Sequence, residues 1–157
     1  MANETTININ EILGRFTWGN VLKLDPCNDG IEFAESVLGL KSGTRLTGEH
    51  LARIRTYSPP WADWVLYRIG SDLPELSTEE RFELFRDLKE DYRRYAAARH
   101  ALGLNGNQRF ELVNSMGYSY WRKEAANYVP DLTMEQREIL RTTHRMEDTQ
   151  TISDVLV

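Results

Sequence analysis

The stretch SPPWADWVLYRIG, residues 58–70, decides the fold class because no other part of the chain is so apolar. Ser58 is placed to cap a helix whose first turn holds two prolines, where a missing N–H costs no hydrogen bond. Apolar side chains follow around the whole cylinder, which is typical of a buried helix. We therefore expect Trp64 and Leu66 in the core. A partner-binding or ligand-binding surface is the alternative interpretation of this segment.

Helical periodicity continues on both sides of this segment. Capping residues and apolar stripes predict further helices over about residues 8–16, 31–40, 47–57, 78–104, 108–129 and 133–146. A short strand over residues 5–10 competes with the first of these, because isoleucines alternate there with polar residues. The sequence shows no evident internal repeat and no domain linker. We expect an all-α fold: a single compact domain over residues 1–146, an irregular bundle of about six helices, with short polar tails.

Composition and charge narrow the functional classes. A hydrophobic content of 41% and a charged content of 27% are typical of a soluble globular protein. The net charge is −5, and residues 131–157, with three basic and six acidic groups, carry much of it. A near-neutral body with an acidic tail argues against a general nucleic-acid binder. The sequence shows a single cysteine, Cys27, and neither a secretion signal nor a membrane-spanning run. We therefore expect a cytoplasmic protein.

No residue pattern predicts catalysis. His50, His100 and His144 lie too far apart for a helical metal-binding pair, so we expect no metal. The segment GTRLTGEH, residues 43–50, has the glycine spacing of a phosphate loop, but Glu49 stands where the loop needs lysine. We interpret it as a structural loop. The chain is accordingly expected to have no cofactor and not to be an enzyme.

The strongest candidate surface is KEDYRRYAAARH, residues 89–100, in which basic side chains alternate with tyrosines. Its candidate partner-binding residues are Lys89, Tyr92, Arg93, Arg94 and Arg99. A solvated helix face is the simplest interpretation, and an acidic protein or a nucleic acid are the possible partners. The arginines are expected to be dispensable for folding, because charged side chains are rarely buried without a partner.

The C-terminal tail, residues 147–157, is a second candidate. Val155, Leu156 and Val157 are apolar and follow an acidic stretch, so they either fray or dock on the domain, a sister subunit or a partner. Together these features favour a non-enzymatic protein that binds another protein, as an adaptor, inhibitor or assembly factor, and they leave a homo-oligomer open. A DNA-binding regulator is the alternative. A third possibility is an apolar-ligand protein with a pocket between the Trp-rich helix and the long helix expected over residues 78–104.

Overall fold

A computed structural model describes residues 8–143 and confirms the all-α fold. The described residues form ten α-helices and one π-helix instead of about six helices, and they contain no strand, only an isolated bridge between Thr17 and Arg45. No helix in this part of the chain is long and apolar enough to cross a bilayer. The chain divides into two compact units between Asp87 and Leu88. A single domain over residues 1–146 stays a prediction.

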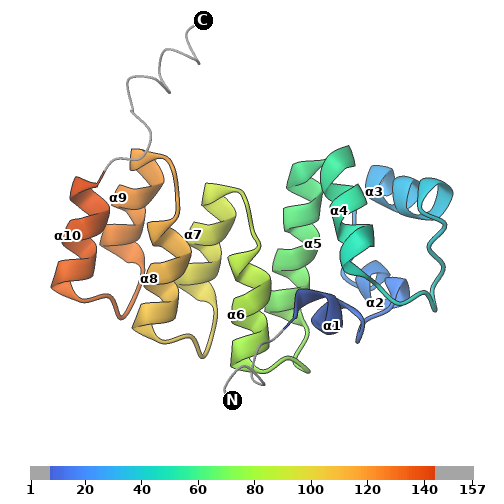
Figure 1. Cartoon of the computed structure of the whole chain (residues 1–157), viewed down its shortest axis with the longest axis horizontal. Coiled ribbons are helices and arrows are strands. Elements are labelled where there is room, and N and C mark those ends of the chain that lie inside the picture. Colours follow the sequence, from blue (N-terminus) through green and yellow to red (C-terminus); the bar gives the residue numbers. More distant parts are fainter. Residues whose placement is uncertain (1–7, 144–157) are drawn as a thin grey trace, which may run out of the picture. The chain divides into compact units, whose positions relative to one another are not determined.

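Seven helical segments belong to the first unit and four to the second (Figure 1). The first unit holds α1 (Ile9–Leu13), α2 (Trp18–Leu22), α3 (Asn28–Glu32), a π-helix (Phe33–Val37), α4 (Gly48–Tyr57), α5 (Pro59–Asp72) and α6 (Thr78–Arg86). The second holds α7 (Asp91–His100), α8 (Gly106–Asn114), α9 (Ser119–Tyr128) and α10 (Met134–Thr142). Helix α1 excludes a strand at residues 9 and 10, and residues 5–7 lie outside the described part.

The long helix expected over residues 78–104 is wrong. Helix α6 ends at Arg86 and α7 begins at Asp91, because Glu90 takes an extended conformation with φ −85° and ψ 134°. Leu88 lies in the turn between these two helices and is buried, at 1% exposure. It therefore packs in the core as the apolar stripe of the expected helix predicts, although it is not helical.

The helix expected over residues 108–129 is also broken. Helix α8 ends at Asn114 and α9 begins at Ser119. The backbone N–H groups of Gly117 and Tyr118 donate to the Asp91 carboxylate at 3.1 and 3.0 Å. The side chain at the start of α7 thus satisfies two donors that a continuous helix would pair with its own carbonyls.

Every second helix begins with the same arrangement. In α2, α4, α6, α8 and α10 the N-cap side chain accepts from the backbone three residues later, and that residue's side chain accepts from the N-cap backbone. These N-caps, Thr17, Thr47, Ser77, Asn105 and Thr133, follow one another at a nearly constant interval, as helical repeats do. The residue before each cap is buried and apolar: Phe16, Leu46, Leu76, Leu104 and Leu132. The expectation of no internal repeat is therefore wrong.

A buried arginine shows how the repeat holds its two helices together. Arg109 of α8 is 7% exposed and donates to three carbonyl oxygens: Leu104 at 3.1 Å, Ala98 at 2.6 Å and Ala101 at 2.8 Å. Two of these carbonyls lie at the C-terminal end of α7, where a helix has no partners of its own for its last carbonyls. One guanidinium, with its several donors, therefore joins the start of α8 to the end of α7.

The same contact recurs one repeat before Arg109 and one repeat after it. Arg81 of α6 donates to the carbonyls of Gly70 and Leu73 at the end of α5, and Arg137 of α10 donates to the carbonyl of Ala126 in α9 at 2.6 Å. Helices α5 and α6, α7 and α8, and α9 and α10 pack against each other as antiparallel pairs (Figure 1). The repeating unit is thus a helical hairpin, the element from which α-solenoids are built.

The apolar helix α5 lies in the core of the first unit. Leu66 is fully buried, as expected, while Trp64 is only half-buried and stacks on Trp61 with ring centroids 6.3 Å apart. Trp61 in turn lies so close to Gly30 that a Cβ at that position would collide with the indole ring. The prediction of a core position is confirmed for Leu66 and holds only in part for Trp64.

Candidate functional site

Arg94, one of the predicted surface residues, points into the second unit. It is 8% exposed, and its guanidinium donates to the carbonyl of Leu112 at 2.6 Å and to that of Leu88 at 2.7 Å. Arg122, at the equivalent position of the next hairpin, is fully buried and binds carbonyls in the same way. The prediction that Arg94 belongs to an exposed basic face is wrong, because backbone carbonyls replace the carboxylate that a buried arginine was expected to need.

The other predicted residues of α7 lie where this helix meets α9. Trp121 of α9 packs against Tyr92 and Tyr95, with ring centroids 6.5 and 5.4 Å apart, and its neighbour Tyr120 meets it edge-on at 4.9 Å. Tyr95 is buried, but Tyr92 is 41% and Tyr120 59% exposed. The aromatic contact therefore joins two successive hairpins and also leaves aromatic area at the surface.

Arginines lie over these rings. The Arg99 guanidinium is 5.9 Å from the ring centre of Tyr95 and 5.1 Å from that of Tyr128, which is itself 53% exposed. Arg93 lies 5.0 Å from the ring of Tyr92. Cation–π contacts of this kind stabilise an arginine at an exposed site by about 0.5–1 kcal/mol.

We name this region the tyrosine–arginine surface. It consists of Tyr92, Arg93, Tyr95, Arg99, Tyr120, Trp121 and Tyr128. Lys89 is exposed just before α7, in the turn that follows α6. Three of the surface residues lie on α9 and were missed from the sequence, although the repeat marks one of them: Tyr120 occupies the position in α9 that Tyr92 occupies in α7.

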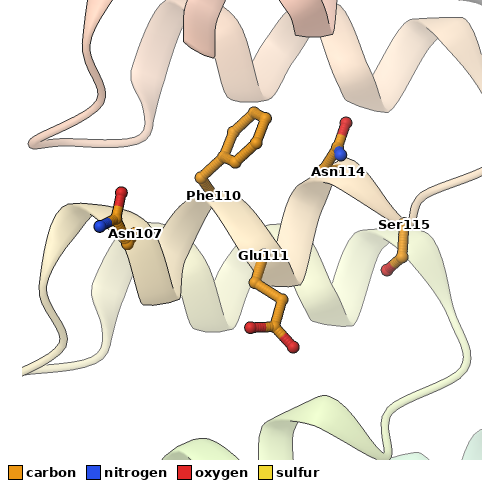
Figure 2. Close-up of a pocket in the computed structure, with 5 residues that line it drawn as sticks. All are labelled: Asn107, Phe110, Glu111, Asn114 and Ser115. Atoms are coloured by element: carbon orange, nitrogen blue, oxygen red, sulfur yellow. The ribbon is translucent and has the colours of Figure 1, made fainter.

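A second candidate region is a groove of about 450 Å³ along α8. Asn107, Phe110, Glu111, Asn114 and Ser115 line it. Figure 2 shows Phe110 and Asn114 on one side of α8 and Glu111 on the other, so the lining side chains do not converge on a common point. Asn107 and Asn114 also accept hydrogen bonds from Gln136 and Arg122. This groove is an open helix surface whose amides contribute to the fold.

The first unit holds two further regions, a small cavity and the loop over residues 43–50. A cavity between α1, α4 and α5 measures only about 10 Å³, barely the space of one water, and does not fit an apolar ligand. The loop over residues 43–50 is tied down: Arg45 donates to the carbonyls of Gly14 and Arg15, and the N–H of Gly48 donates to Asn10. A structural role for this loop agrees with these bonds.

Comparison with family models, with curated proteins and with solved structures finds no significant match. The chemistry of the surface is therefore the basis for any functional conclusion. Within residues 8–143 no three His, Cys, Asp or Glu side chains gather in a way that could hold a metal ion. The candidate tail residues Val155, Leu156 and Val157 lie outside the described residues, and their docking stays a prediction.

Proposed function

We propose that this chain is a non-enzymatic protein that binds another protein through the tyrosine–arginine surface, as an adaptor, inhibitor or assembly factor. The observation that supports this most is the exposure of three tyrosines on two neighbouring helices, Tyr92, Tyr120 and Tyr128, beside stacked arginines. Tyrosine, tryptophan and arginine are the residue types enriched at the energetic centres of protein interfaces. Ordered aromatic side chains also lose little conformational entropy when a partner binds.

The repeat supports the same function. Helical hairpins in series present equivalent side chains at a regular interval, and repeat proteins use such extended surfaces for binding. Tyr92 and Tyr120 occupy equivalent positions in the two hairpins of the second unit, and both are exposed. Cys27 is exposed, and the chain has no second cysteine with which to form an internal disulfide. For this reason we expect the protein to act in the reducing cytoplasm.

A test begins with partners captured from the native host by the full chain. The triple variant Tyr92→Ser, Tyr120→Ser, Tyr128→Ser should lose at least tenfold in affinity for such a partner, because it removes three exposed contacts of the type that dominates interfaces. The matched control is Leu102→Ser with Met134→Ser, two apolar side chains that are 84% and 82% exposed but lie outside the surface. Equal affinity of the triple variant and the wild type would refute the proposal.

A DNA-binding regulator is the second candidate, supported by Arg93 and Arg99, which lie over tyrosine rings, and by the exposed Lys89 just before α7. Phosphate contacts release counterions, so its binding to duplex DNA must weaken steeply as salt rises. Retention on DNA that is lost between low and physiological salt, and lost in Arg99→Ala, would favour this candidate over the first.

A further inference from the structure

Arg99 is an exposed cation that contacts two aromatic rings. Its guanidinium lies over the rings of Tyr95 and Tyr128, on two different helices, and it donates to the Tyr95 hydroxyl at 3.0 Å. A guanidinium carries several N–H donors in one plane, and this hydrogen bond uses only one of its nitrogens. Among residues 8–143 its other nitrogens form no hydrogen bond, and the side chain is exposed.

Two other arginines that lie over aromatic rings are each paired with an acidic residue of their own helix. Arg68 lies 5.2 Å from the ring of Trp64 and pairs with Asp72 at 2.6 Å. Arg86 lies 5.6 Å from the ring of Phe82 and pairs with Glu83 at 2.9 Å. Arg99 has no such partner, because none of the Asp and Glu side chains within residues 8–143 forms an ion pair with it.

We propose that Arg99 is the carboxylate receptor of the tyrosine–arginine surface, so that the partner presents an acidic segment: an Asp or Glu side chain to Arg99, and apolar or aromatic neighbours to Tyr92, Tyr120 and Tyr128. An arginine fork matches the two oxygens of a carboxylate, and stacking fixes that fork before binding, which lowers the entropy lost on association. This inference rests on the function proposed above and adds the chemistry of the partner.

An acidic protein segment fits this surface better than a nucleic acid does. Nucleic-acid binding requires several cations that can each reach a phosphate. Here Lys89, Arg93 and Lys123 already have further interactions within the structure, and Arg94 is buried. One ordered cation surrounded by tyrosines is suited to a single carboxylate flanked by apolar groups.

The test measures the binding of two labelled probes to the full chain by fluorescence anisotropy: a random copolymer of glutamate and tyrosine, and a duplex DNA. Arg99→Met should weaken binding of the copolymer by about tenfold or more, since a charge-assisted hydrogen bond is lost. Arg99→Lys should weaken it as well, because an ammonium keeps the charge but not the fork. Arg86→Met is the matched control, a stacked but paired arginine, and should bind as the wild type does.

Several results would overturn the inference. These are copolymer affinity unchanged in both Arg99→Met and Arg99→Lys, no copolymer binding by the wild type, or tighter binding of the DNA than of the copolymer. If Arg99→Met melts at a lower temperature than the wild type, its loss of binding could reflect lost stability. Arg99→Lys, which keeps the charge, then provides the test. Loss of copolymer binding in Tyr120→Ser but not in either Arg99 variant would overturn the carboxylate role alone and leave the surface as a binding site.

Discussion

Three arginines of the second unit are buried with backbone carbonyls as their partners. Arg94, Arg109 and Arg122 are 8%, 7% and 0% exposed, and each donates to backbone carbonyls. A charged side chain usually indicates a solvated position. Here the arginines are buried instead, because the last carbonyls of a helix need hydrogen-bond donors and carry partial negative charge.

Arg109→Met tests this account of the buried arginines. Three carbonyls lose their donor, so we expect the free energy of unfolding to fall by about 3 kcal/mol. Chemical denaturation of the full chain measures it. Arg53→Met, at an exposed position of α4, is the matched control and should change stability by less than about 0.5 kcal/mol. Equal stability of the two variants would show that these carbonyl contacts contribute little.

Leu66→Ala tests the core of the first unit. Leu66 is fully buried in α5, so its truncation should cost about 2–5 kcal/mol through lost burial and the cavity that remains. Leu102→Ala, at an 84% exposed position, is the control for the same chemical change. If urea denaturation gave both variants the stability of the wild type, α5 would have to be reassigned as a surface helix.

At the scale of helices, the sequence allows the starts of α4, α6 and α10 to be predicted but not the breaks that begin α7 and α9. Thr47, Ser77 and Thr133 are caps as expected, because a short polar side chain before an apolar periodic segment is typical of a helix start. The pair expected between Asn8 and Glu11 is absent, since the Asn8 side chain accepts from the N–H of Asn10 instead. The break at Glu90 carries no glycine or proline, and helix-forming residues surround it. Tertiary contacts of Leu88 and Asp91 overrule the local preference there.

The difference between local sequence pattern and tertiary contact also explains which residues of the tyrosine–arginine surface could be predicted. Residues of α7 were predicted because tyrosine and arginine alternate within one segment. Those of α9 were missed, since Trp121 and Tyr128 come beside the α7 side chains only through the packing of one hairpin on the next. The recurrence of Arg81, Arg109 and Arg137 at equal intervals was the signal in the sequence for the repeated hairpin itself.

Gly106→Ala tests the packing of one hairpin on the next. A Cβ at Gly106, the first residue of α8, would lie 2.2 Å from the backbone oxygen of Asp131, in the turn that precedes α10. Alanine favours helices over glycine by about 1 kcal/mol, but here overpacking should outweigh this and destabilise the chain by about 1–3 kcal/mol. Thermal melting checks the sign. Gly43→Ala, where nothing lies within 4 Å, should be close to neutral.

At the scale of the whole molecule, the two hairpins of the second unit share a backbone arrangement but differ in side chains on one flank. The flank of α7 that meets α9 presents Tyr95 and Arg99, whereas the corresponding positions of α9 are Lys123 and Asn127, both exposed. The α7 residues of the tyrosine–arginine surface are therefore replaced at these two positions of α9.

Deletion of residues 150–157 tests the role expected for the tail. If Val155, Leu156 and Val157 dock on the chain, a sister subunit or a partner, the truncated protein should differ from the full chain in molar mass by light scattering or in partner affinity. Identical values for both, together with tail amides that exchange as fast as those of an unfolded peptide, would exclude docking.

Hydroxyl-radical footprinting with a captured partner tests the central claim most directly, because tyrosine and tryptophan side chains react readily and report exposure individually. Binding should protect Tyr92, Tyr120 and Tyr128 from oxidation and leave Tyr57, 49% exposed in the first unit, as reactive as in the free chain. Unchanged oxidation of the three tyrosines in the complex, or protection centred on Tyr57, would contradict the assignment of the tyrosine–arginine surface as the binding site.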